Sequence, residues 1–183
     1  MSQNFRKLLH GLRNDESLMT AYRHGDSLAF ESLYNRHKNG VFAYISRHCP
    51  ANFVEEVAQE TWVAIVKAAE SYTIKAKFKT YLYHIAHNKI VDHWRRVRPD
   101  VEDIDTESLI DCKAGSIDQE YGYAELMTAI KRLPNEQRDA FLLREEGFSH
   151  EDIAAITGCG RETVKSRLRY AAQTLQKQLG GSS

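Results

Sequence analysis

The chain has few cysteines and no long apolar run, and these absences exclude several classes of protein. Its three cysteines, at positions 49, 112 and 159, stand far apart and form no CxxC pair. Such spacing gives neither a disulfide framework nor a thiolate zinc site. No apolar run reaches the ~20 residues that a membrane-spanning helix needs, and no signal peptide is visible. We therefore expect a cytoplasmic protein with no direct membrane insertion.

Catalytic motifs are also missing. The sequence contains no Gly-rich phosphate loop and no nucleophile motif, so we expect neither an enzyme nor a cofactor. His84 and His87 stand three residues apart on a predicted helix, a spacing that suits a shared metal ion. Because no third ligand stands at a suitable spacing, we expect no metal site and favour phosphate contacts for these histidines.

The formal net charge is zero, with 25 basic and 25 acidic residues, but the two signs are segregated along the chain. Residues 75–98 carry seven Lys or Arg and one acid, whereas residues 100–120 carry eight acids and one Lys. A net charge of zero that results from separate basic and acidic blocks indicates basic surfaces for nucleic acid and an acidic segment with another role.

Helical periodicity extends over most of the chain, and no strand pattern is visible. We expect helices from Asp26 to near Pro50 and over about 53–71, 80–96, 119–133, 135–146 and 161–179. The apolar stripe of the first of these helices includes Tyr34 and Phe42. The predicted fold is all-α, with two small helical domains joined by an acidic flexible linker. Its expected parts are an N-terminal extension (1–25), a first domain (26–98), the linker (99–118) and a second domain (119–183).

The second domain contains a helix-turn-helix pattern over 149–170. Ile153 marks the apolar side of its first helix, and Val164 can pin the second helix against it. Gly158 stands where the turn requires a positive φ. Ser149 and Asp152 have the spacing of a capping box.

Cations and hydroxyls occupy the outward side of the second helix of this pattern. Cations reach phosphates and guanine edges in a major groove, and hydroxyls bond phosphates. A helical hairpin with a solvated charged face is the simpler alternative. We expect Lys165 and Arg169 to contact bases in part. The expected phosphate anchors are Arg161, Thr163, Ser166 and Arg167.

A loop that alternates bases with aromatics, residues 72–79, precedes the predicted 80–96 helix. Stacking rings and cations together are typical of single-stranded nucleic-acid binding. Each ring could equally be part of the core, and the sequence leaves both interpretations open.

In this order the motifs resemble the sigma factors of bacterial RNA polymerase, in the small two-domain extracytoplasmic-function (ECF) group of the sigma-70 family. The likeness covers about 26–96 and 119–178. It rests on the segments 56–62, 78–96 and 158–168, on Leu133-Pro134 and on Arg138. Two positions depart from the family pattern: Glu56 replaces the usual Asp, and Gly160-Arg161 replaces the usual Ser or Pro at the start of the recognition helix.

The resemblance implies a factor that binds core RNA polymerase, directs it to promoters and helps to melt DNA. The polymerase partners would be the clamp helices of the largest subunit and the flap of the second subunit, and the acidic linker would follow the RNA-exit path. An anti-sigma factor is a further implied partner. The implied polymerase-binding residues are Glu56, Gln59, Glu60 and Trp62. The implied minus-ten DNA residues are Tyr72, Lys75, Lys77, Phe78, Lys79, Tyr83, Asn88, Arg95 and Arg96. The implied minus-thirty-five DNA residues are Arg161, Glu162, Thr163, Lys165, Ser166, Arg167, Arg169 and Tyr170.

A different class of protein is the alternative. A helix-turn-helix regulator with a ligand-sensing or dimerising first domain would explain 149–170. It would not explain the basic and aromatic loop, the acidic linker or the acidic and amide cluster at 55–60.

Overall fold

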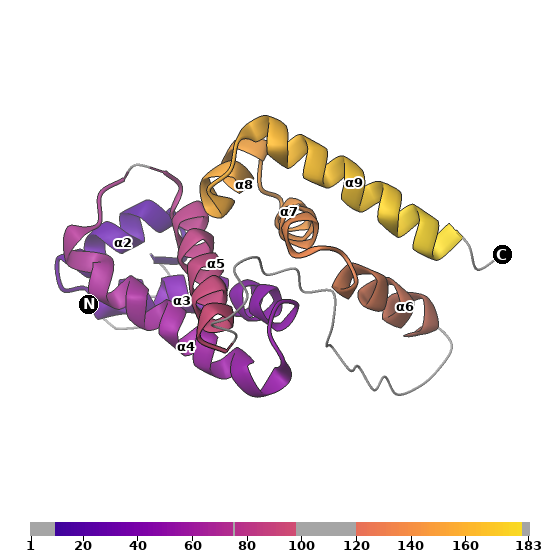
Figure 1. Ribbon diagram of the computed structural model, residues 1–183. Coiled ribbons are helices and arrows are strands. Elements are labelled where there is room, and N and C mark those ends of the chain that lie inside the picture. Colours follow the sequence, from indigo (N-terminus) through magenta and orange to yellow (C-terminus); the bar gives the residue numbers. More distant parts are fainter. Residues whose placement is uncertain (1–9, 75, 98–119, 181–183) are drawn as a thin grey trace. The chain divides into compact units, whose positions relative to one another are not determined.

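Every regular element in the described part of the chain is a helix, as the sequence predicts (Figure 1). The computed structural model describes residues 10–74, 76–97 and 120–180. The chain forms two compact units, and the boundary between them lies between residues 93 and 94. The predicted all-α fold with two helical domains is confirmed, while the acidic segment 99–118 lies outside the described residues.

The first unit is built around α3. It contains α2 (Asp15–Arg23), α3 (Ser27–Ser46), α4 (Ala51–Ala68), the short 3-10 helix η1 (Ala69–Ser71) and α5 (Phe78–Val97) up to His93. Helix α3 packs against both α2 and α4. It meets α5 through Tyr44 and Tyr83, whose ring centroids are 5.3 Å apart. The fully buried core residues include Leu33, Val41, Ile45, Val57, Ile65, Leu82 and Ala86.

Helix α2 is the main departure from the sequence prediction, which left residues 1–25 as an extension. Its residues Leu18 and Met19 are fully buried, so α2 belongs to the first unit. Asn14 caps the helix by accepting the N–H of Ser17 on its Oδ1 at 2.9 Å. Two acids follow in the first turn, where they complement the helix dipole. This start signal is present in the sequence, and Leu18, Met19 and Tyr22 have the spacing of one helical face, so the signal for α2 was available.

Asp15 ties α2 to α3. Its carboxylate accepts a hydrogen bond from Arg36 and one from His37 Nε2 at 2.7 Å. Burial raises the pKa of Asp15, but the bonds and charges of His37 and Arg36 outweigh burial and hold that pKa below its usual value. The ionised carboxylate is therefore part of the α2–α3 junction.

The second unit is arranged around α9 (Arg161–Gly180). This helix packs against α6 (Glu120–Lys131), α7 (Asn135–Glu145) and α8 (His150–Thr157). Arg138 is buried and donates to the carbonyl oxygen of Lys131 at 3.1 Å, which fixes the turn between α6 and α7. The buried apolar side chains include Leu133, Leu142, Leu143, Ile153, Ile156 and Val164.

The predicted turn chemistry of the helix-turn-helix is confirmed. The Ser149 hydroxyl accepts the N–H of Asp152 at 3.1 Å, and the Asp152 side chain accepts the N–H of Ser149 at 3.2 Å. Gly158 ends α8 in the left-handed region, at φ +68°. Val164 is fully buried, as its predicted packing role requires.

Candidate nucleic-acid and partner interfaces

The acids and amide predicted to bind polymerase gather on one side of α4. Glu56, Gln59 and Glu60 line a shallow groove of about 410 Å³, together with Lys67 and with Lys89 of α5. Helical spacing of three and four residues brings the three predicted side chains together. Lys89 Nζ lies 4.0 Å from Glu60 Oε2, at the outer limit of an ion pair.

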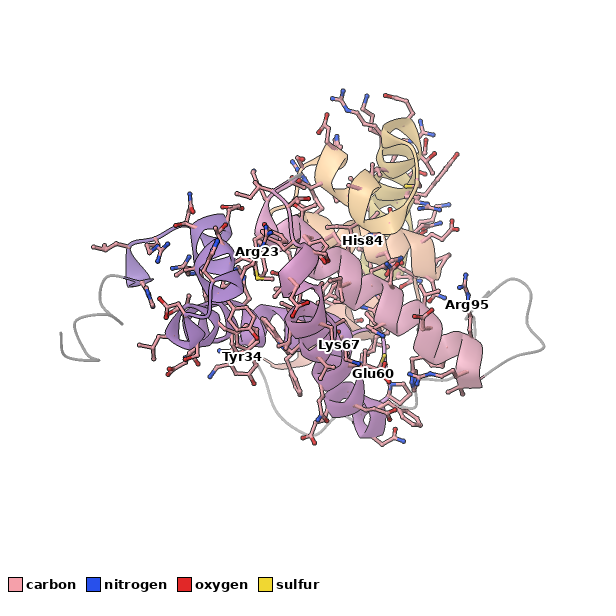
Figure 2. All side chains as sticks on the ribbon, turned by 90° about the vertical axis from the view of Figure 1, so that its left-hand side faces the viewer. Arg23, Tyr34, Glu60, Lys67, His84 and Arg95 are labelled. Atoms are coloured by element: carbon pink, nitrogen blue, oxygen red, sulfur yellow. The ribbon has the colours of Figure 1, made fainter. Side chains whose placement is uncertain are left out.

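An apolar groove of about 570 Å³ adjoins this polar surface, between α3 and α4. Trp62 forms its floor: the side chain is 9% exposed, and its ring meets that of Tyr34 edge-on with centroids 5.0 Å apart. Phe42, Val63 and Val66 stay 45%, 43% and 42% exposed along the groove. Figure 2 shows Tyr34, Lys67 and Glu60 along this side of the unit, with Lys67 between the other two. We name this surface the α3–α4 groove.

The α3–α4 groove was not predicted, because Tyr34 and Phe42 fit the apolar stripe expected to face the core. In the structure Leu33 and Val41 take the buried side and their neighbours Tyr34 and Phe42 are exposed. Adjacent helical residues point in directions about 100° apart, so the two members of a pair can face different sides of the helix. The two apolar pairs were the available signal for a second apolar face.

The rings predicted to stack on unpaired bases are core residues in the structure. Phe78, Tyr83 and Tyr72 are buried, so their faces are not open to a base as they are packed here. The expectation that Tyr83 is available to a ligand is therefore wrong, and the core interpretation holds for these three rings. The reason for Tyr83 is the helical period: Tyr83, Ala86 and Ile90 stand three and four residues apart, on the side of α5 that faces the core.

The exposed part of the loop consists of residues 73, 74, 76 and 77, and Lys75 lies outside the described residues. Ile74 is 63% exposed. Burial, followed by the charges of Glu16 and other neighbours, raises the pKa of Tyr72 to about 12. The Tyr72 phenol is therefore uncharged at neutral pH, and its ring lies buried beneath the exposed part of the loop.

Polar side chains continue from the loop along the outer side of α5. Asn88 is exposed, and its amide nitrogen lies 3.1 Å from His84 Nε2. Lys79 Nζ lies 5.6 Å from the centroid of the Tyr83 ring, which it covers. Arg95 and Arg96 are exposed in the last turn, and Figure 2 shows Arg95 pointing outward. We name as the α5 face the half-buried Lys79 together with four exposed residues, Lys77, Asn88, Arg95 and Arg96.

Two cations of α9, Lys165 and Arg169, contact side chains of their own helix. Lys165 Nζ contacts Glu162 Oε1 on the same helix at 2.7 Å, and both side chains are exposed. The Lys165 hydrogen bond and charge hold the pKa of Glu162 below its usual value. The Arg169 guanidinium lies over the Tyr170 ring at 5.0 Å. Thr163 is exposed beside them.

Two other cations of α9 reach neighbouring helices. Arg161 Nε pairs with Glu151 of α8 at 2.9 Å, with both side chains exposed. Arg167 Nη2 pairs with Glu136 of α7 at 2.9 Å, and its side chain is only 19% exposed. Arg167 was predicted as a phosphate anchor, yet in the structure it holds α9 against α7.

Two family models match the chain in sequence order. The model described as Sigma-70 region 2 matches residues 33–99, and the model described as Sigma-70, region 4 matches residues 123–175. The first match holds α4, the loop and α5, and the second holds the helix-turn-helix. No helix in the described ranges is both long enough and apolar enough to span a membrane.

Curated relatives are similar over nearly the full chain. The ECF RNA polymerase sigma-E factors of Haemophilus influenzae and Escherichia coli (strain K12) are each 30% identical to it over 179 residues. These alignments cover 90% of this chain, and 95% and 94% of the two relatives.

Solved structures share the fold. CnrH in complex with the cytosolic domain of CnrY is similar with a TM-score of 0.70 at 23% identity, over 92% of this chain and 99% of that one. The sigma factor RpoE in complex with the anti-sigma factor NepR, from Bartonella quintana, is similar with a TM-score of 0.67 at 25% identity, over 84% and 98% of the chains.

Proposed function

This chain belongs to the sigma-70 family and is a sigma factor of the ECF group, and from that premise we propose which of its surfaces serve each step of initiation. As a sigma factor it binds core RNA polymerase, directs it to promoters and helps to melt the DNA. The observation that carries the assignment is that a basic and amide-bearing helix face and a helix-turn-helix occur in one chain, each within its matching family region.

The polymerase-binding surface is the outer side of α4. Glu56, Gln59 and Glu60 provide charge and hydrogen-bonding groups, and the α3–α4 groove beside them provides apolar area. A buried apolar patch with a polar rim is the usual composition of a stable interface. The clamp helices of the largest polymerase subunit are the proposed partner here, and the flap of the second subunit is the proposed partner of the second unit.

The α5 face and the exposed part of the loop are the proposed minus-ten surface. Lys77, Arg95 and Arg96 can follow the backbone of an unpaired strand, since cations dominate such contacts. Asn88 offers an amide that can bond a base edge. The buried rings Tyr72, Phe78 and Tyr83 support this surface from below, and an extruded base would meet the polar side chains first.

The outward side of α9 is the proposed minus-thirty-five surface. Lys165 and Arg169 are the proposed base readers, and Arg161, Thr163 and Ser166 the proposed phosphate anchors. Glu162 and Tyr170 lie among them and complete the surface. Arg167, with its guanidinium bound to Glu136, keeps α9 in place for these contacts.

An anti-sigma factor is a further proposed partner, and the cytoplasm is the proposed location. The similarity to a sigma factor solved with an anti-sigma factor supports the partner. The helix-turn-helix regulator is not favoured, because both halves of the chain match sigma-70 regions. The role of the acidic segment 99–118 in the RNA-exit path stays a prediction.

A binding comparison tests the proposal. Fluorescently labelled full-length protein should bind core RNA polymerase tightly and bind duplex promoter DNA weakly when alone, because its net charge is zero. A regulator would do the reverse: it would bind the duplex alone and ignore the polymerase. The second pattern would contradict the proposed function.

A further inference from the structure

The loop formed by residues 73–77 is held at both of its ends by α2. Where the loop begins, Arg23 Nη1 donates to the carbonyl oxygen of Tyr72 at 3.3 Å. Where it ends, the N–H of Phe78 donates to Glu16 Oε1 at 2.8 Å. The Tyr72 and Phe78 rings close the base of the loop with an edge contact, centroids 6.4 Å apart. Arg23 is labelled in Figure 2.

The residue before helix α5 is not one that caps a helix with its side chain. The first N–H groups of a helix have no partner inside it, and Ser, Thr, Asp or Asn at the preceding position usually satisfies one of them. Lys77 precedes α5, and its side chain has only donors, so that side chain cannot accept an N–H of the first turn. The first turn has no acidic residue and contains Lys79, whose charge is unfavourable at this end of the helix dipole.

Glu16 provides what this helix start lacks. Its carboxylate accepts the N–H of Phe78, the first residue of α5, and brings a negative charge to the positive end of the helix. Lys77 and Lys79, which suit a nucleic-acid backbone, can therefore stand at the start of a stable helix. The acceptor comes from α2, an element 62 residues earlier in the chain.

We propose that Glu16 is a positioning residue for the promoter-melting loop, with Arg23 as the second anchor. The inference rests on the proposed minus-ten role of this loop. A loop fixed at both ends loses less conformational freedom when it binds an unpaired strand, so the anchors favour opening of the promoter. Neither anchor needs to touch DNA to have this effect.

The first measurement uses the free full-length protein. Hydrogen–deuterium exchange over residues 72–81 should become roughly tenfold faster in Glu16→Ala, the size expected for a lost cap. Glu16→Gln should stay close to wild type, because the amide oxygen of glutamine accepts the same N–H. Exposed Glu70 of η1 is the matched control: Glu70→Ala removes an equal charge beside the loop without removing an anchor.

The second measurement uses holoenzyme on the promoter of the transcript most strongly induced by expression of this protein. Permanganate footprinting should show open-complex formation about fivefold to tenfold lower for Glu16→Ala on duplex DNA. A template with mismatched, already unpaired bases should restore much of the difference. Binding to core polymerase should be unchanged for every variant, and Glu70→Ala should open the duplex as well as wild type or better.

Two results would overturn the inference. One is unchanged exchange and unchanged opening in Glu16→Ala. The other is an equal loss on duplex and mismatched templates together with weaker polymerase binding, which would assign Glu16 a general folding role. If wild-type holoenzyme opens no promoter, the proposed function itself fails. If wild type opens promoters and Glu16→Ala equals it, only the inference fails.

Discussion

Two cations of α9 that stand two residues apart meet different surroundings. Lys165 is exposed and contacts only a neighbour on its own helix, Glu162, among the described contacts. Arg167 is mostly covered and bound to Glu136 of another helix. An exposed contact of this kind is worth little and exchanges easily for a DNA contact, whereas the mostly covered stem of Arg167 packs between two helices, and its truncation loses that packing.

We therefore expect opposite effects of the two substitutions. Lys165→Ala should change the preferred base at one minus-thirty-five position, because a base-edge contact discriminates by about 1–3 kcal/mol. Arg167→Ala should lower the free energy of unfolding and leave base preference unchanged. Lys177→Ala, at an exposed position of the same helix, is the matched control. Transcription over single-base promoter variants and thermal melts provide the readouts.

Two transcription results would contradict the assignment of Lys165 as a base reader. If Lys165→Ala lowers transcription from every promoter variant by the same factor, the side chain acts on phosphates only. If Arg167→Ala alone shifts the preferred base, the roles of the two cations are reversed.

The Asp15 carboxylate gives the fold a defined acid sensitivity. Its pKa in the folded protein is lowered from the usual 3.8, so its contribution to stability is present above pH 3.8 and is lost as pH falls through the folded value. Asp15→Asn should lower the free energy of unfolding at pH 7 by about 1–3 kcal/mol, as for other lost bonds to charged groups. Urea melts of both proteins from pH 3 to pH 7 measure this. Identical curves at pH 7 would contradict the role of the Asp15 bonds.

Helix α5 has one side packed in the core and one exposed side. Substitutions on the two sides should therefore have different effects on stability and on promoter melting. Phe78 is fully buried, so Phe78→Ala should cost about 3–5 kcal/mol of stability rather than act only on melting. Asn88 is exposed, so Asn88→Ala should leave stability unchanged and impair open-complex formation on duplex promoters.

Thermal melts and permanganate footprinting on duplex and mismatched templates separate these effects. Restored opening of the Asn88→Ala holoenzyme on the mismatched template supports a role in melting. Equal defects on both templates would place Asn88 outside the melting step. A stable Phe78→Ala protein with a defect only on duplex DNA would show that Phe78 leaves the core to meet DNA.

Helix α4 carries the polymerase-binding prediction. Gln59→Ala combined with Glu60→Lys should weaken binding to core polymerase on the order of tenfold or more, because a reversed charge meets a surface complementary to the acid. Glu70→Lys, at an exposed position of η1 that lines neither groove, makes the same charge change within the first unit and should have no such effect. A pull-down with full-length proteins measures both. Unchanged polymerase affinity of the double variant would remove this face from the interface.

Periodicity and turn chemistry sufficed to predict the helices from α3 onward, since Ser149, Asp152 and Gly158 act through local backbone geometry. What the sequence did not reveal depends on contacts between distant segments. Glu16 meets Phe78 across 62 residues, and no local pattern announces that bond. The rings of the loop were ambiguous for the same reason, because a local pattern of bases and aromatics does not say which side of the fold each ring faces.

The chain joins a helix proposed to bind polymerase, a proposed melting surface and a proposed duplex reader, and its opposed charges add to zero. We therefore expect the free protein to have little activity toward promoters, and the polymerase to be required for their recognition. Initiation then depends on both units being present in one polypeptide rather than on either unit alone.

Reconstituted run-off transcription tests this most directly. Core RNA polymerase is mixed with the purified full-length protein and with linear DNA that carries the promoter most strongly induced by its expression. We expect one transcript from a single start, absent when the protein is omitted and reduced when the Gln59→Ala/Glu60→Lys variant replaces it. A transcript that is independent of the protein, or none at any concentration of a protein that binds the duplex tightly on its own, would contradict it.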